Sequence, residues 1–330
     1  MLTSYAVADQ KLRPLSDALG ECAAAVWVDM LRPTPEEDAN LEKALGLDIP
    51  TREEMEEIEV SSRLYTEPGA AYVTALLISR ADTERAILTP ATFILTERRL
   101  ITVRYEEPKA FSAFAVRAAK SPIGGDSPDF ALVGLFEAII ERMADVLERA
   151  TKDIDRLSHE IFGAQGKRPT GAQSFQKLLV ELGKKGELAS NTRDSLVTLS
   201  RAFGYLILYT DQRAKDGRDR KGDKEFRARL KSVARDAGSL SDHVSFVSQK
   251  ITFLLDATLG LVNIEQNQII KIFSIAAVAF LPPTLIASLY GMNFIHMPEL
   301  DEPWAYPAAV GAMVLSAVVP LIYFKRKGWW

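Results

Sequence analysis

The pentapeptide Tyr290-Gly291-Met292-Asn293-Phe294 lies between the two long apolar runs of the chain, residues 272–290 and 306–324. Neither run contains a charged residue. Each has about the length that a helix needs to cross the ~30 Å hydrocarbon layer of a membrane. Two such helices can also be buried in the core of a soluble protein. A polar segment and an acidic loop between the runs favour instead two membrane spans, with an entrance for a hydrated cation where they connect.

The charged residues around these runs predict their orientation. Basic residues flank the outer ends of the two runs in the sequence. Lys271 precedes the first run, and Lys325, Arg326 and Lys327 follow the second. The loop of residues 291–305 carries Glu299, Asp301 and Glu302 and neither lysine nor arginine. The positive-inside rule therefore predicts a multi-pass membrane protein with both termini in the cytoplasm and the loop outside. The three loop acids either concentrate cations at the entrance or are simply solvated.

Composition excludes several classes of function. The chain has 330 residues, a net charge of -4 and one cysteine, Cys22. A small net charge gives no reason to expect nucleic acid as a partner. One cysteine excludes an internal disulfide and any site built from several cysteines, and we expect this thiol to be a small buried apolar group. No nucleotide-binding or hydrolase motif is present, and the three histidines are scattered, so we do not expect an enzyme.

Residues 1–123 are predicted to form an α+β cytoplasmic domain. Apolar, β-branched runs predict strands at residues 24–29, 71–78, 92–96 and 100–105. Start signals at Thr34 and Thr51 predict helices at residues 35–45 and 52–60, the second with the pattern of a capping box. Glu97-Arg98-Arg99 is predicted to be a hairpin turn.

The remaining residues are predicted to be helical. Residues 124–223 read as a helical hairpin, with helices at 130–162 and 172–211, the second weakened near Gly183 and Gly186. Residues 224–290 contain no proline before Pro282, which predicts one helix roughly 100 Å long. Its first part, residues 224–271, would be a stalk, and its second part the first span. The loop 291–305, the second span 306–324 and a basic tail 325–330 follow.

Small, polar and apolar residues recur along the first span with helical spacing. They are Asn267, Ile270, Phe273, Ala277, Leu281 and Thr284. This stripe predicts a surface that lines a pore when several copies associate, since amides and hydroxyls offer oxygen to an ion and apolar rings close a pore by dewetting. Ordinary helix packing in lipid would give the same spacing. Pro282 and Pro283 remove two backbone donors and are expected to kink or loosen the helix.

The end of the first span carries the candidate selectivity site, Gly291, Met292 and Asn293. Gly291 is expected to end the helix in a left-handed conformation. Asn293 would present a carboxamide oxygen at the entrance. Magnesium sheds its water reluctantly, so a ring of neutral amides could hold the hydrated ion weakly enough to release it.

These residues resemble the CorA family of magnesium transport proteins. The resemblance rests on Tyr290–Phe294 followed by Met297-Pro298-Glu299-Leu300 and by Trp304-Ala305-Tyr306-Pro307. The N-terminal segments 50–54, Glu59 and 61–65 are also similar to bacterial members. The resemblance implies a funnel-shaped homopentamer in a bacterial inner membrane, with an α/β/α sandwich as cytoplasmic domain. It also implies an outer selectivity site at Gly291 and Asn293, and pore-lining positions that coincide with the stripe defined above.

The chain departs from the family pattern at several positions. Ile270 and Leu281 stand where other members often have methionine at the apolar gate, and Ala305 replaces the usual glycine. The family senses internal magnesium through carboxylates between neighbouring domains. One such aspartate aligns with Ser232, so the expected sensing residues are only candidates: Asp82, Glu84, Asp236 and Asp242. All four could equally be ordinary surface acids.

The resemblance implies a channel or transporter for Mg²⁺ influx that is driven by membrane potential and closed by internal Mg²⁺. Co²⁺ and Ni²⁺ are expected as further substrates, Mg²⁺ as the regulatory ion, and the lipid bilayer and further copies of the chain as partners, with neither nucleic acid nor nucleotide. Two alternatives stay open. One is a zinc-transporting relative, against which Met292 argues; the other is a two-span receptor with a cytoplasmic sensor.

Overall fold

The computed structural model describes residues 1–20, 22–57, 59–83, 85–163, 171–215, 222–292, 297–298 and 302–329. The chain divides into two compact units. Unit 1 comprises Met1–Arg168 and Lys177–Leu255, and unit 2 comprises Pro169–Gln176 and Asp256–Trp330.

Unit 1 contains a seven-stranded sheet with the strand order β2-β1-β3-β7-β6-β5-β4. The strands are β1 (Leu2–Ala8), β2 (Lys11–Pro14), β3 (Trp27–Leu31), β4 (Leu64–Glu67), β5 (Ala70–Ser79), β6 (Ile87–Thr96) and β7 (Leu100–Arg104). β3 and β7 are parallel neighbours, and the other neighbouring strands are antiparallel. The predicted turn at Glu97-Arg98-Arg99 is confirmed, because it joins β6 to β7, in which Leu95 pairs with Leu100.

The helices are α1 (Pro35–Leu45), α2 (Arg52–Glu56), α3 (Val60–Arg63), α4 (Lys109–Lys120), α5 (Pro128–Phe162), α6 (Ala172–Lys215), α7 (Asp223–Tyr290) and α8 (Ala305–Arg326), with a short 3-10 helix at Cys22–Ala24. Capping boxes begin α1 at Thr34 with Glu37 and α2 at Thr51 with Glu54. In both, the threonine hydroxyl accepts a backbone N–H and the glutamate satisfies the backbone of the threonine.

Alternate residues of the central strands face two different helical layers. Val28 and Met30 of β3 share one apolar cluster with Leu41 of α1 and Met55 of α2, and Cys22 is buried in the same cluster. On the opposite face, Trp27 contacts Phe114 of α4 with ring centroids 5.5 Å apart. The sheet thus lies between two helical layers, which confirms the expected α/β/α sandwich.

A buried ion pair lies on the α4 side of the sheet. Arg104 donates from Nε and Nη2 to the two Asp29 oxygens at 3.0 and 2.7 Å, and the side chains are only 7% and 8% exposed. Thr102 donates to Asp29 Oδ1 at 2.7 Å, and the Trp27 Nε1–H donates to Thr102 at 3.0 Å. Both Asp29 oxygens and all three Arg104 guanidinium nitrogens therefore take part in hydrogen bonds, Nη1 through the Glu106 carbonyl, as a buried ionic group requires.

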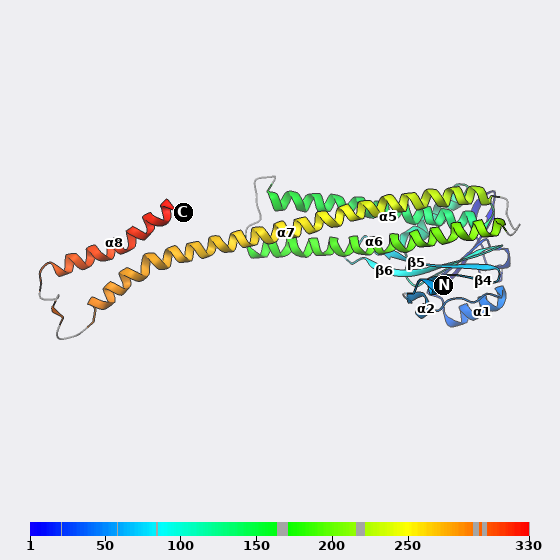
Figure 1. Cartoon of the computed structure of the whole chain (residues 1–330). Helices are drawn as coiled ribbons and strands as arrows, with labels where there is room; N and C mark the ends of the chain where they lie inside the picture. The colour runs from blue at the N-terminus through cyan, green and yellow to red at the C-terminus, as the bar shows by residue number, and fades with distance from the viewer. Residues whose placement is uncertain are drawn as a thin grey trace. The chain divides into compact units, whose positions relative to one another are not determined.

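Helices α5, α6 and the first part of α7 run side by side over the sheet (Figure 1). The Phe136 ring of α5 lies 4.9 Å from Phe93 of β6 and 5.0 Å from Phe203 of α6. Ion pairs join the helices, among them Arg229 of α7 with Glu137 of α5 at 2.7 Å. α6 also completes the hydrogen bonding of β5, since Ser195 donates to the Leu76 carbonyl and Thr198 accepts the Leu76 N–H.

Three sequence-based expectations about unit 1 need correction. The strand predicted at 24–29 begins later, because residues 22–24 form a 3-10 helix and β3 starts at Trp27. The helix predicted at 52–60 ends at Glu56, because Glu57 takes an extended conformation, and α3 starts anew at Val60. β1, β2, β4 and α4 were not predicted. The weakening predicted near Gly183 and Gly186 is not observed, because α6 is one continuous helix through both glycines.

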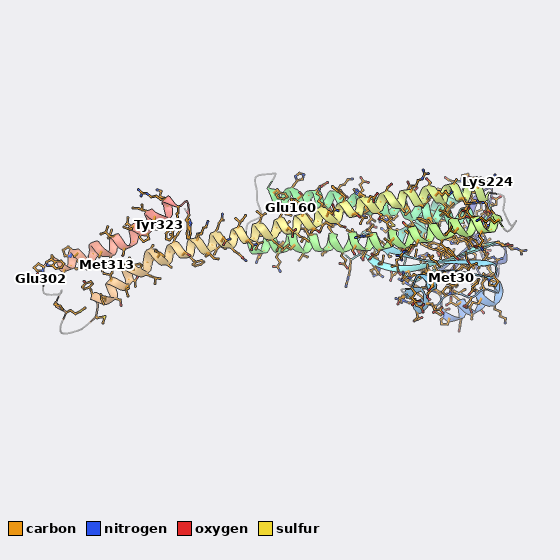
Figure 2. The ribbon with its side chains drawn as sticks, viewed as in Figure 1. Met30, Glu160, Lys224, Glu302, Met313 and Tyr323 are labelled. Atoms are coloured by element: carbon orange, nitrogen blue, oxygen red, sulfur yellow. The ribbon has the colours of Figure 1, made fainter. Side chains whose placement is uncertain are left out.

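Unit 2 contains the remainder of α7, which begins there at Asp256, and α8. Each of α7 and α8 has an 18-residue window of mean hydropathy 2.0, none of it buried in the chain, so both are candidate membrane spans by length and composition. α7 continues through Pro282 and Pro283 to Tyr290. Figure 2 shows Glu302 and Tyr323 at opposite ends of α8, so the acidic and basic flanks of this span lie at opposite ends.

Candidate functional site

The six residues of the predicted stripe are all exposed in the described chain. Ile270, Phe273 and Leu281 are 61%, 72% and 66% exposed. Asn267, Ala277 and Thr284 are exposed as well. The three large apolar residues share one face of α7 with the small or polar ones, and Ile270 and Phe273 follow each other directly along the stripe. The Thr284 hydroxyl donates to the Phe280 carbonyl at 2.6 Å, so its donor is already satisfied within the helix.

The opposite face of α7 is partly covered. Most half-buried residues of this segment lie on that face: Lys271, Ile275, Ala276, Ala279, Pro282, Pro283 and Ile286. Ser274 is also half-buried but lies on the side of the stripe. At 100° per residue the two sets lie on nearly opposite sides of the helix. One face of this segment is therefore occupied within the chain, and the face that carries the predicted stripe is open to another molecule or to lipid.

Gly291 follows the last residue of α7, as predicted, but not in the predicted conformation. It lacks the positive φ of a left-handed residue, and its N–H donates to the Ala287 carbonyl at 2.9 Å. A Cβ at this position would lie 3.0 Å from the same carbonyl oxygen, which is closer than most such contacts. Close approach to the preceding turn favours glycine at this position, and backbone handedness does not.

The rest of the predicted entrance is described only in part. Met292 is 41% exposed, and its N–H donates to the Leu289 carbonyl at 3.4 Å. Asn293, Glu299 and Asp301 lie outside the described residues. Glu302 is exposed, and its carbonyl accepts the Ala305 N–H at 3.1 Å just before α8.

Asp82, a candidate sensing residue, lies in the connection between β5 and β6 and contacts three cations of its own chain. Lys109 at the start of α4 lies 2.5 Å from Asp82 Oδ2, and Arg142 of α5 donates to both oxygens at 2.6 and 2.5 Å. Arg149, two turns further along α5, donates to Oδ1. Hydrogen bonds from Lys109, Arg149 and Arg142 hold the pKa of the Asp82 carboxyl well below its usual range. This carboxylate is therefore neutralised within one chain.

The other candidate sensing residues differ from Asp82. Asp236 and Asp242 are exposed on the part of α7 that belongs to unit 1, and neither forms an ion pair within the part of the chain that the structure describes. Glu84 lies outside the described residues. Among the residues described, no group of three or more His, Cys, Asp or Glu side chains could hold a metal ion. A sensing site built from Asp236 or Asp242 would need ligands from elsewhere.

Comparison with known proteins identifies the family. The sequence profile described as "CorA-like Mg2+ transporter protein" matches residues 23–326. The chain belongs to this family. Two relatives named "Magnesium transport protein CorA", from Haemophilus influenzae and Escherichia coli K12, are each 34% identical to it over 333 and 332 residues, with 100% of both chains covered. The CorA resemblance predicted from the signature residues is thereby confirmed.

The fold agrees with that of a CorA structure. The CorA magnesium transporter from Methanocaldococcus jannaschii aligns over 100% of this chain and 99% of its own, with a TM-score of 0.67 and 18% sequence identity. The mixed sheet, the long helices and the two C-terminal candidate spans are thus those of a CorA protein.

Sequence reasoning missed the partners of Asp82. Lys109, Arg142 and Arg149 are far from Asp82 in the sequence, and single basic residues carry no local signal for such an arrangement. The seven-residue interval between Arg142 and Arg149 places both on one face of α5, and this spacing was the one sequence signal for a shared anionic partner.

Proposed function

We propose that this CorA protein transports Mg²⁺ into the cell through a pore lined by the α7 helices of five copies. The observation that carries the proposal is the two-sided character of α7: one face is covered within the chain, and the other presents Asn267, Phe273 and Thr284 uncovered up to Gly291. A single helix cannot enclose a pore. Further copies of the chain would cover these faces and bring their amides, hydroxyls and apolar side chains around one axis.

The proposed placement has both spans in a bacterial inner membrane, with unit 1 and both termini in the cytoplasm. Lys271 and the basic residues after α8 support it, because lysine and arginine concentrate on the cytoplasmic side. The acidic Glu302 lies at the other end of α8 (Figure 2). Within this arrangement, residues 224–271 act as the stalk and residues 291–305 as the outer loop.

The proposed selectivity filter is the ring formed by Gly291, Met292 and Asn293 of each copy. A carboxamide oxygen accepts hydrogen bonds from the water of a hydrated ion without a full negative charge. Weak binding of that kind suits conduction, which requires an ion to leave as well as enter. Glu299, Asp301 and Glu302 would raise the cation concentration outside the ring.

Membrane potential suffices as the driving force. A divalent cation that crosses a ~100 mV inside-negative potential gains about 4.6 kcal/mol, at ~2.3 kcal/mol per charge. This corresponds to more than a thousandfold accumulation, so an ungated pore would overload the cell. Ile270, Phe273 and Leu281 would form the apolar rings of the gate.

We propose that internal Mg²⁺ closes this gate by binding between neighbouring copies of unit 1. Asp236 and Asp242 are the candidate ligands, since both are exposed and lack ion-pair partners in the described chain. Asp82 is a weaker candidate because its carboxylate already binds three cations. Co²⁺ and Ni²⁺ would share the pathway, since a filter that acts through water discriminates mainly by hydrated size.

Flux through the reconstituted protein tests the proposal. Liposomes that contain the full-length protein and an inside-negative potassium diffusion potential should take up Mg²⁺, detected with an internal magnesium dye. Asn293→Ala should reduce the preference for Mg²⁺ over Zn²⁺ and Co²⁺ in competition. Asn191→Ala, on α6, removes an amide outside the spans and should leave flux unchanged.

The same assay separates the alternatives. Absence of flux for every divalent cation would favour a two-span receptor, and Zn²⁺ uptake that Mg²⁺ does not compete with would favour a zinc transporter. If Asn293→Ala retained the selectivity of the parent protein, the filter assignment would be wrong.

A further inference from the structure

The segment after α8 folds back on the helix in a Schellman motif. The Gly328 N–H donates to the Lys325 carbonyl at 3.2 Å, and the Trp329 N–H donates to the Phe324 carbonyl at 3.1 Å. Gly328 has a φ of 70°, in the left-handed region that favours glycine. The motif also has its usual apolar contact, because the Trp329 and Phe324 rings stack with centroids 4.9 Å apart. The position of Trp329 is therefore set by a defined turn.

This turn brings together the basic ends of both candidate spans. Lys271, just before the apolar run of α7, has its Nζ 5.7 Å from the centroid of the Trp329 ring. Lys327 lies over the Tyr323 ring at 5.3 Å. Aromatic faces attract these cations without neutralising them, and they limit how far each ammonium can move.

Among the described residues, no carboxylate pairs with the cations of this basic end. Lys271, Lys325, Arg326 and Lys327 form no ion pair within the part of the chain that the structure describes. Lys325, Arg326 and Lys327 are exposed, and Lys271 is half-buried. Exposed cations without an ion pair also occur in the described part of unit 1, for example Lys231 and Arg235. The basic end differs from these because four unpaired cations lie together beside the rings of Tyr323 and Trp329.

We propose that the basic end, composed of Lys271, Lys325, Arg326, Lys327 and the rings of Tyr323 and Trp329, binds the phosphate group of an anionic phospholipid. The inference rests on the membrane insertion that is part of the proposed function. In that placement the cations lie at headgroup depth on the cytoplasmic side, where anionic lipids are available. Tyrosine and tryptophan favour the same interface, because their rings are apolar and their N–H and O–H groups are polar.

The arrangement favours a lipid over a soluble phosphate compound. A lipid supplies both parts of the ligand at once: a phosphate for Lys271 and Lys327, and acyl chains for the apolar surfaces of α7 and α8 next to them. The site also spans two helices, since Lys271 belongs to α7 and Trp329 follows α8. A bound headgroup would thus tie the pore-lining span to the second span.

Native mass spectrometry of the full-length protein in detergent tests the proposal, with phosphatidylglycerol as the probe and phosphatidylcholine of the same acyl chains as the reference. We expect preferential binding of phosphatidylglycerol. Lys271→Gln and Lys327→Gln should each weaken it about fivefold, the value expected for one lysine near an anionic surface. Lys231→Gln, on α7 in unit 1, removes the same charge away from the spans and should have no effect. Trp329→Ala should weaken binding without a change of net charge, and Trp329→Phe should restore most of it.

Three results would overturn the proposal. They are equal binding of the two lipids, equal behaviour of Lys271→Gln and Lys231→Gln, and displacement of phosphatidylglycerol by millimolar inorganic phosphate, which would indicate a soluble-phosphate site. Elution volume and melting temperature of each variant separate a lost site from a misfolded protein. Mg²⁺ flux in pure phosphatidylcholine liposomes tests the proposed function separately. Flux without preferential phosphatidylglycerol binding would contradict only the lipid site. Preferential binding without flux would contradict only the transport function.

Discussion

Replacing Asp82 by asparagine tests whether this carboxylate is a structural anion of unit 1 or a ligand for a regulatory metal. In the structure, Asp82 ties the β5–β6 connection to Lys109 of α4 and to Arg142 and Arg149 of α5. Asp82→Asn keeps the size of the side chain and removes its charge. If the carboxylate is structural, the variant should lose stability and keep its response to Mg²⁺.

The expected loss follows from the exposure of the four side chains. Asp82 and Arg142 are 25% and 27% exposed, whereas Lys109 and Arg149 are 65% and 48% exposed. Exposed ion pairs stabilise a protein by about 0.2–1 kcal/mol each, so we expect about 2 kcal/mol for the three together. In a domain of this size that lowers the melting temperature by about 4–8 °C.

The pH dependence provides a second measurement. The pKa of Asp82 is lowered in the folded protein, so its stabilising effect is complete above the unfolded pKa of about 4 and is lost as pH falls towards the folded value. The difference in melting temperature between the parent protein and Asp82→Asn should be constant from pH 5 to 8 and shrink below about pH 4. Fluorescence of Trp27, which is 1% exposed in unit 1, can report the transition.

Asp194→Asn is the matched control, because Asp194 is exposed on α6 and forms no ion pair within the described chain. It should leave the melting temperature within about 1 °C of the parent value. The reasoning fails if Asp82→Asn melts like this control. It also fails if the variant abolishes the stabilisation that Mg²⁺ confers on the parent protein, since Asp82 would then be a metal ligand.

Three further substitutions probe the pore and the core. Leu281→Asn should wet the proposed gate and raise Mg²⁺ influx at high internal Mg²⁺ in the liposome assay, and influx that still stops would contradict a gate at this ring. Gly291→Ala should alter ion selectivity, because its Cβ would press on the Ala287 carbonyl at 3.0 Å, whereas Gly311→Ala in α8 meets no atom within 4 Å and should be silent. Asp29→Ala leaves Arg104 buried without its partner and should destabilise unit 1 by about 3–5 kcal/mol in thermal unfolding, and a loss below about 1 kcal/mol would contradict the importance of the pair.

Local signals in the sequence were enough for the membrane part and for the helix starts. Apolar run length predicted the spans, and Thr34 and Thr51 marked helix starts because a cap acts within one turn. β1 was missed because most of its residues are half-buried and no clear alternation results. The break at Glu57 was missed because neither glycine nor proline marks it. α4 begins after Pro108 without a side-chain cap, so its start carries no signal either.

The candidate functional residues also differ in whether a local sequence signal predicts their surroundings. Spacing on one helix is a local property, and it placed Asn267, Phe273 and Leu281 on one face of α7. The surroundings of Asp82 depend instead on how α4 and α5 pack against the β5–β6 connection, which no local pattern encodes. The handedness of Gly291 was likewise inferred from residue type alone. In the structure, the glycine has no positive φ, and a Cβ there would make a tight 3.0 Å contact with the Ala287 carbonyl oxygen.

Neither the apolar members of the α7 stripe nor its hydroxyl distinguishes a pore face from a lipid face. Phe273 and Leu281 are as compatible with acyl chains as with a closed gate. Thr284 is also compatible with both, because its hydroxyl donates to the Phe280 carbonyl within the helix. Asn267 differs, since its carboxamide forms no side-chain hydrogen bond within the described chain although it precedes the apolar run by little more than one turn. Lys271, one turn later, lies at headgroup depth in the proposed placement, so Asn267 is on the aqueous side of it, where its carboxamide is available to water and to a hydrated ion at the inner mouth of the proposed pore.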